Sequence, residues 1–206
     1  MRLALALTLA LIAPAAAVAG DLSVVVRTPQ GAPVADAVVT VQAPHSGPIR
    51  FSWPYRMAQQ NLMFDPFVLV VPVGADVAFP NRDKVQHHVY SFSKAKTFEL
   101  KLYGRDETRV VKFDKPGVVL LGCNIHDSMT AFILVVDTPW AAKTDAQGRA
   151  VIHDLPAGAQ PVTVWRPYMH APGNAISSTV NIPRTGAMTL NVTGDVRPPP
   201  GHHAMY

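Results

Sequence analysis

The stretch LGCNIHDSM, residues 121–129, decides how the rest of this chain is interpreted. It carries a thiol at Cys123, an imidazole at His126 and a thioether at Met129, in the spacing Cys-x2-His-x2-Met. Short apolar runs of strand length flank it on both sides, so we expect a β-sheet to hold both ends of this loop rigidly. Three metal-ligating groups within seven positions make the loop the first candidate for a metal site.

A second source of imidazole lies upstream, at His87 and His88, where another strand is expected to begin. Two imidazoles, one thiolate and a weak axial thioether are the ligands of a trigonal type 1, or blue, copper site. Thiolate and thioether favour Cu(I), and imidazole also accommodates Cu(II), so the mixed set serves both oxidation states. Zinc sites use Cys, His and carboxylates rather than thioether. The residues therefore predict one type 1 copper ion.

Each of these residues has a more ordinary interpretation when it is taken alone. A single Cys is most often a small buried hydrophobe, Met129 would belong to the core, and His126 would be a surface or hydrogen-bonding residue. We favour copper because the three share one strand–loop–strand junction and an upstream His pair accompanies them. The remaining polar candidates are expected to be structural, exposed or loop-shaping; they are His45, Asp127, Ser128, His153 and His170.

Short β-branched runs separated by Gly and Pro turns predict an all-β fold built from sandwiches. The 206 residues include 19 Pro, with 49% apolar and 16% charged residues, so the chain can bury a core. One Cys excludes an internal disulfide. The expected strands are Leu22–Arg27, Val38–Gln42, Phe67–Pro72, Ala75–Phe79, His88–Phe92, Thr97–Leu102, Thr108–Phe113, Val118–Leu121, Ala131–Val136, Ala150–His153, Pro161–Trp165 and Met188–Val192.

The first residues predict an exported protein. Arg2, an apolar run and an Ala-x-Ala site together resemble a signal peptide at residues 1–19, cleaved after Ala19. An uncleaved anchor is the alternative, but Pro14 interrupts a run that is near the lower length limit for a spanning helix. We therefore expect a periplasmic or secreted protein with no stable membrane insertion after cleavage. Because export compartments oxidise thiols, copper ligation would also explain why the lone Cys123 is retained.

Charge and motif content argue against several other classes. The 18 Lys and Arg exceed the 14 Asp and Glu by four, without a basic cluster, so we expect no nucleic-acid partner. No paired carboxylates, Ser/His/Asp spacing or phosphate-cradling Gly loop stands out. Four ligands would also leave the metal no open position for a substrate, so we expect that the protein is not an enzyme.

Residues 77–89 (VAFPNRDKVQHHV) and 113–136 resemble the cupredoxins, the blue-copper family. The Cys-x2-His-x2-Met spacing is similar to that of amicyanin. The segments FPN at 79–81, HHVYSFS at 87–93 and GCNIHD at 122–127 further resemble a plastocyanin-like group often labelled methylamine-utilisation proteins. The resemblance covers residues 57–136 and implies a Greek-key cupredoxin sandwich. It also implies that the copper ligands are His87, Cys123, His126 and Met129.

Three positions depart from the pattern of the family. His88 stands where the family has Asn, and Asn124 where it has Ser or Thr. Our hypothesis is that these two side chains exchange the hydrogen bond that joins the ligand segments and so orient the metal site. We favour His87 over His88 as ligand, because strand parity places it opposite the copper loop. The family's aromatic residue ahead of the Cys is absent, since Leu121 and Gly122 precede Cys123.

The segments on both sides of the copper region resemble a carboxypeptidase-regulatory-like (prealbumin-type) sandwich, at residues 31–41, 142–150, 154–158 and 162–165. We therefore expect the cupredoxin domain, 47–136, to be inserted in or packed on a second sandwich formed by 20–46 and 137–194, with a docking or scaffold role. One larger irregular sandwich is the alternative. Residues 195–206 are expected to be a flexible tail, whose His202, His203 and Met205 could instead capture copper.

Together these features predict an exported protein that carries single electrons between redox partners by Cu(I)/Cu(II) cycling. The expected partner is a redox protein, such as a cytochrome or dehydrogenase, bound transiently. Two alternatives belong to other classes. One is a periplasmic copper carrier or sensor that delivers copper to another protein, and the other is a binding module whose copper segment is purely structural.

Overall fold

The computed structural model describes residues 19–197. The expected signal peptide lies outside this range except for Ala19, and so do His202, His203 and Met205. Within the described range the chain forms sixteen strands and one short 3₁₀ turn, Pro172–Asn174, so the predicted all-β class is confirmed. No helix among these residues is long and apolar enough to cross a membrane.

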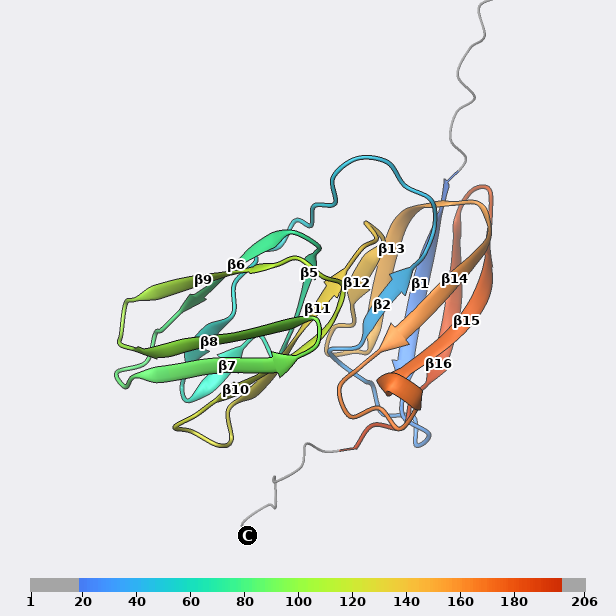
Figure 1. The fold of residues 1–206 in the computed structure, drawn as a ribbon. Coiled ribbons are helices and arrows are strands. Elements are labelled where there is room, and N and C mark those ends of the chain that lie inside the picture. Colours follow the sequence, from blue (N-terminus) through green and yellow to red (C-terminus); the bar gives the residue numbers. More distant parts are fainter. Residues whose placement is uncertain (1–18, 198–206) are drawn as a thin grey trace, which may run out of the picture.

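The first sandwich is built around a five-stranded sheet with the strand order β5-β11-β10-β7-β8 (Figure 1). Neighbouring strands are antiparallel, except that β5 runs parallel to β11. The strand pairs β6-β9 and β3-β4 complete this sandwich. The strands are β3 (Ala58–Gln60), β4 (Met63–Asp65), β5 (Val68–Pro72), β6 (Ala75–Pro80), β7 (His87–Ser93), β8 (Lys96–Tyr103), β9 (Thr108–Phe113), β10 (Gly117–Cys123) and β11 (Thr130–Val136).

The core of the first sandwich follows from the period of two along its strands. On β10, Val119, Leu121 and Cys123 are buried, whereas the alternate residue Leu120 is exposed. The aromatic rings of Phe79, Phe98 and Phe113 pack with centroid separations between 5.7 and 6.5 Å. Cys123 therefore lies at the end of a strand whose inner face is fixed in a packed core.

Two further sheets, with the orders β13-β1-β16 and β12-β2-β14-β15, enclose a second core. Their inward residues are mostly aliphatic, with Leu22, Val24, Val39 and Val164 at most 1% exposed. The strand β1 is antiparallel to β13 and parallel to β16. The strands are β1 (Ala19–Arg27), β2 (Val38–Val41), β12 (Ala141–Lys143), β13 (Arg149–Pro156), β14 (Gly158–Trp165), β15 (Ala175–Ile182) and β16 (Ala187–Thr193).

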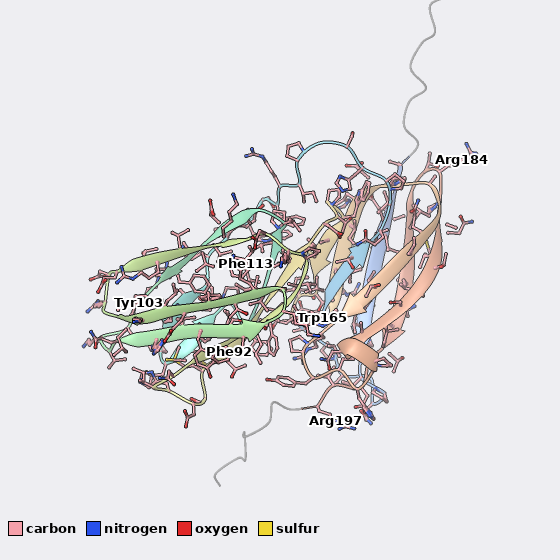
Figure 2. All side chains as sticks on the ribbon, viewed as in Figure 1. Phe92, Tyr103, Phe113, Trp165, Arg184 and Arg197 are labelled. Atoms are coloured by element: carbon pink, nitrogen blue, oxygen red, sulfur yellow. The ribbon has the colours of Figure 1, made fainter. Side chains whose placement is uncertain are left out.

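The two sandwiches meet through an apolar contact. Val68 and Phe132, from the five-stranded sheet, join a cluster with Val38 and Trp165 of the second sandwich. The rings of Phe132 and Trp165 lie 6.1 Å apart, edge to face (Trp165 is labelled in Figure 2). In sequence, β3 to β11 all lie between β2 and β12, which pair with each other. The domain boundaries inferred from the sequence stay a prediction.

Four strands were not expected from the sequence, namely β3, β4, β12 and β15. Three of them have only three residues. The fourth, AISSTVNI, lies at a sheet edge and consists mainly of polar residues, so it has no apolar run to predict a strand. Two residues of the segment expected to be a tail make main-chain contacts: Val196 pairs with Met169, and the Arg197 amide donates to the carbonyl of Tyr168.

Replacing Ile133 with Ala tests the packing that holds the loop ends. Ile133 is fully buried on β11, so the cavity should lower the free energy of unfolding of the metal-free protein by about 2–5 kcal/mol, measured with urea. Val151→Ala is the matched control, because Val151 is 46% exposed, and it should change stability little. Equal losses in the two variants would contradict the described core.

Candidate metal centre

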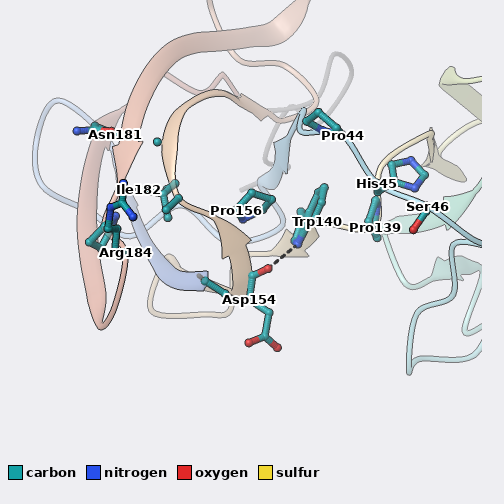
Figure 3. A pocket seen from close by; sticks show the side chains of 14 residues that line it. Pro44, His45, Ser46, Pro139, Trp140, Asp154, Pro156, Asn181, Ile182 and Arg184 are labelled. Carbon is teal, nitrogen blue, oxygen red and sulfur yellow. Dashed lines mark hydrogen bonds between the residues drawn. The ribbon is translucent and has the colours of Figure 1, made fainter. Parts of the chain in front are cut away.

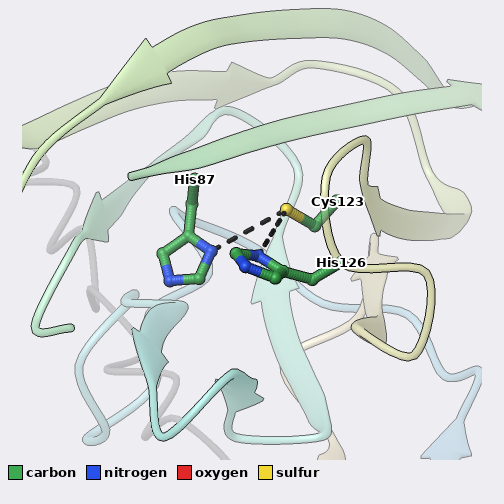
Figure 4. Close-up of side chains that lie close together, drawn as sticks. All are labelled: His87, Cys123 and His126. Carbon is green, nitrogen blue, oxygen red and sulfur yellow. Dashed lines mark hydrogen bonds between the residues drawn. The ribbon is translucent and has the colours of Figure 1, made fainter. Parts of the chain in front are cut away.

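Three candidate ligands converge where β7 begins and β10 ends (Figure 4). The Sγ atom of Cys123 lies 3.8 Å from Nδ1 of His87 and 3.7 Å from Nδ1 of His126. One ligand atom from each residue lies within 4.8 Å of the others, and no other group of three or more His, Cys, Asp or Glu in the described range could hold a metal ion. Figure 1 shows the loop after β10 at the end of the first sandwich that points away from the second sandwich.

The spacing of these atoms fits a metal ion between them. Bonds of about 2.3 Å to sulfur and about 2.0–2.1 Å to nitrogen, the values known for zinc, place the two donors roughly 3.8 Å apart when the angle between them is trigonal. The separations of 3.7 and 3.8 Å agree with this value. One soft sulfur and two imidazoles are donors of the kind that suit a copper site.

Burial differs among the three residues. His87 is fully buried and Cys123 is 3% exposed, whereas His126 is only partly buried. The protein therefore excludes water from two of the three ligand atoms. His126 forms the contact between the site and the surface.

Main-chain hydrogen bonds hold the ligand loop. The Asn124 amide donates to the carbonyl of His88 at 3.0 Å, and the Met129 amide donates to the carbonyl of His126 at 2.9 Å. Cys123 is also paired with Val89 in the β7-β10 ladder. The loop thus begins on a ladder and closes on a turn, which fixes the direction of its side chains.

His87 and His88 point to opposite faces of the sheet. His88 Nε2 lies 2.8 Å from Oε1 of Glu99 on β8, whereas Nδ1 of His87 lies 3.8 Å from the sulfur of Cys123. The register of β7 with β8 shifts between His87 and Val89, a bulge of the kind that re-aims side chains near functional sites. The hydrogen bond that we expected between the side chains of His88 and Asn124 is not among the hydrogen bonds of the described residues. The two ligand segments are joined instead by the main-chain hydrogen bond from the Asn124 amide to the His88 carbonyl.

Asp83 is the residue that the sequence interpretation missed. Its Oδ2 lies 2.8 Å from Nε2 of the buried His87. A carboxylate on one imidazole nitrogen holds the proton there and directs the lone pair of the other nitrogen toward a metal. The sequence did offer one signal for this contact. Asp83 is an acidic residue four positions ahead of the candidate ligand His87, in the loop that leads into the strand.

The Asp83 carboxylate is itself held by a turn. The amides of Asn61 and Leu62 donate to its two oxygens at 2.6 and 3.1 Å. Both turn residues have positive φ, 57° and 55°, between β3 and β4, a conformation that suits a tight hairpin. Partial burial raises the pKa of Asp83, but hydrogen bonds from His87, Leu62 and Asn61 outweigh it, so the pKa lies below its ordinary value.

Asn81 fixes the loop that carries Asp83. Its side-chain Oδ1 accepts the Asp83 amide at 2.9 Å, and its Nδ2 donates to the carbonyls of Val85 and Tyr103 at 2.8 and 3.0 Å. Asn81 is 1% exposed, so these bonds are protected from water. The segment from Asn81 to His87 is therefore rigidly supported.

The other residues that the sequence analysis singled out lie outside the group formed by His87, Cys123 and His126. Met129 is 2% exposed and belongs to the first core, and its role as axial ligand stays a prediction. Asp127 and Ser128 are exposed on the loop. His153 and His170 lie on the second sandwich, near Asp21 and Asp195 respectively.

His45 lines an open pocket of about 1190 Å³ in the second sandwich (Figure 3). Its Nε2 lies 3.1 Å from the carbonyl of Asp137, and its ring packs edge to face on Trp140. Trp140 in turn donates from Nε1 to the carbonyl of Asp154. This pocket contains no part of the His87–Cys123–His126 group.

No protein-family model matches the chain, and no curated protein matches it in sequence. Similar solved structures include a novel purple cupredoxin from Nitrosopumilus maritimus, at 20% identity and a TM-score of 0.36, with 39% of this chain and 98% of that chain covered. A reduced mutant of amicyanin has 19% identity and a TM-score of 0.37, with 48% and 98% covered. A copper-containing nitrite reductase from Thermus scotoductus SA-01 has 26% identity and a TM-score of 0.40, with 56% of this chain but only 28% of that chain covered.

These likenesses concern fold alone, and only part of this chain. The β-sandwich predicted for this part of an all-β chain is confirmed by its sheets. The site in that sandwich can hold a metal ion through His87, Cys123 and His126.

Replacing Asp83 with Asn tests the support of His87. Asn has no charge and no longer fixes the proton on Nε2, so the affinity for added copper should fall about 10–100-fold, measured by competitive titration. Asp76→Asn is the matched control, since Asp76 is exposed on β6 and makes no ion pair with a described residue. An unchanged affinity in the Asp83 variant would show that the contact does not support a ligand.

Proposed function

We propose that this protein is a type 1 copper protein that carries single electrons between redox partners. The observation that carries the proposal is the convergence of Cys123 Sγ with Nδ1 of His87 and Nδ1 of His126, at 3.8 and 3.7 Å. The thioether of Met129 would complete the set as a weak axial ligand. Copper bound there would supply one-electron chemistry by alternating between Cu(I) and Cu(II).

The residues around the site suit that task. The β7-β10 ladder and the Asp83–His87 contact hold the ligand atoms nearly still, so little rearrangement would accompany a change of oxidation state. The buried His87 and Cys123 keep water away from the ligand atoms. The partly exposed His126 provides a short route to a partner that docks over the loop.

The rest of the organisation belongs to the same proposal. Residues 47–136 form the copper domain, inserted between two halves of a second sandwich, 20–46 and 137–194, that serves docking or scaffolding. Export to the periplasm or outside the cell agrees with a lone cysteine that copper protects. No substrate position is needed, because the four ligands would fill the metal, so the protein acts as a carrier rather than an enzyme.

A copper carrier is the second candidate, favoured by the partial exposure of His126 at the loop surface. The two functions differ in how firmly copper is held. Retention of copper against a Cu(I) chelator, with a reversible reduction potential, supports electron transfer. Rapid loss to the chelator supports delivery.

The visible and paramagnetic spectra of the copper-loaded protein test the site. We expect an intense visible thiolate-to-copper band that is lost in Cys123→Ser and in His87→Ala. His88→Ala should retain the band, because His88 points to the opposite face, and it serves as the matched control. The absence of the band from the unsubstituted protein would contradict the proposed function, and equal loss in the two His variants would contradict the ligand choice.

Replacing Met129 with Gln tests the axial ligand. Gln should keep the copper bound and lower the reduction potential, since the axial ligand tunes the potential of such sites. Cyclic voltammetry provides the measurement, with Met63→Gln as control because Met63 is 60% exposed. An unchanged potential would argue against axial ligation by Met129.

A further inference from the structure

Tyr90 replaces, from a neighbouring strand, the aromatic residue that is absent before Cys123. Tyr90 on β7 pairs directly with Gly122 on β10, the residue next to Cys123 in the chain. A Cβ atom placed on Gly122 would lie only 2.7 Å from Cζ of Tyr90 and 2.8 Å from its hydroxyl oxygen. Only glycine therefore allows the ring to lie against the backbone at this position.

From Tyr90 the aromatic contact continues to the surface. The rings of Tyr90 and Phe92 lie 5.2 Å apart, and Phe92 is 81% exposed (labelled in Figure 2). Leu120 on β10 lies on the same face of the sheet and is 47% exposed. We call these three residues, Tyr90, Phe92 and Leu120, the Phe92 surface. An exposed aromatic ring beside an exposed Leu is the kind of patch that marks an interaction site.

The Phe92 surface lies next to the apolar contact between the two sandwiches. Leu120 pairs with Phe132, and Phe132 packs against Trp165 of the second sandwich. The outer face of the five-stranded sheet is therefore covered at the β11 side and left open at the β7 side. Two exposed lysines, Lys94 and Lys115, border the open part at the β7–β8 turn and before β10, and neither forms an ion pair with a described residue. The carboxylate of Glu99, in register with Tyr90 on β8, lies 2.8 Å from Nε2 of His88.

We propose that the Phe92 surface docks a redox protein whose contact patch is apolar and bordered by carboxylates, with Tyr90 coupling that surface to Cys123. The carboxylates would complement Lys94 and Lys115. The inference rests on the proposed function, because it needs an electron at the site. In each encounter one electron leaves bound Cu(I), which becomes Cu(II), and reduces the partner's one-electron acceptor; no bond is made or broken and no proton moves.

A continuous series of contacts joins Cys123 to Phe92 and supports the proposed electronic coupling. Cys123 is covalently joined to Gly122, the Tyr90 ring touches Gly122, and Phe92 packs on Tyr90. Electron tunnelling weakens steeply across gaps between atoms, so removing the ring from Gly122 should slow this route. A second exit on the face away from His126 would let the protein receive an electron from one partner and pass it to another.

A photoactive ruthenium complex attached at Lys94→Cys tests the coupling in the copper-loaded protein. Cys123 is 3% exposed, so the label is directed to the introduced thiol. Flash photolysis measures the rate of electron transfer between the label and copper. Tyr90→Leu should lower this rate several-fold, whereas Tyr90→Phe, which keeps a ring on Gly122, should retain it.

Labelling at Val110→Cys provides the matched control, since Val110 is 61% exposed on β9 in a different sheet. Tyr90→Leu should leave the rate from that label unchanged. An unchanged rate from position 94, with the visible band intact, would overturn the role of Tyr90. Loss of the band from the labelled protein with Tyr90 in place would instead contradict the proposed function.

Docking is tested separately on the metal-free protein with 1-anilinonaphthalene-8-sulfonate, an apolar aromatic anion. We expect it to shift the amide NMR signals of Phe92, Leu120 and Lys94, and this effect should be lost in Phe92→Ser. Val110→Ser is the control for removal of an exposed apolar side chain and should change nothing. Shifts centred elsewhere, or unaffected by Phe92→Ser, would overturn the docking site.

Discussion

The pairing of β7 with β10 is the constraint on which the candidate site depends. In that register Cys123 lies opposite Val89, so the inner face of β10 presents a thiol to the inner face of β7, where His87 points. A slip of one residue would turn either side chain to the other face of the sheet. The buried core on both strands makes such a slip costly, since Val119 and Leu121 would move to the outside with it. The sandwich core thus fixes the site geometry before any metal arrives.

The two faces of this ladder have different tasks. On the inner face, the β3–β4 turn holds Asp83, Asp83 holds His87, and His87 directs its free nitrogen toward Cys123. On the outer face, Tyr90 lies on Gly122 and leads to Phe92. One short piece of sheet therefore carries the candidate ligands on one face and the aromatic contact from Gly122 to Phe92 on the other. Glycine is required at position 122 because a side chain there would displace the ring.

Part of the fold and of the candidate site could be predicted from the sequence. Whether a residue could be predicted depended on how local its contacts are. The Cys-x2-His spacing and strand parity at His87 are local features, so they predicted which side chains converge. Asp83 acts through a turn at residues 61 and 62, and Tyr90 acts through a register between strands, so both depend on contacts distant in sequence. The burial of Met129 suits a core residue and a ligand equally, and neither sequence nor burial separates these roles. The polar edge strand β15 had no apolar pattern to reveal it.

X-ray absorption at the copper edge tests the central claim most directly, because it reports the atoms bound to the metal without regard to function. With one equivalent of copper added to the protein, the account predicts a single short copper–sulfur bond and two copper–nitrogen bonds from imidazole. Only nitrogen and oxygen neighbours around the copper would contradict it, since Cys123 would then lie outside the coordination sphere.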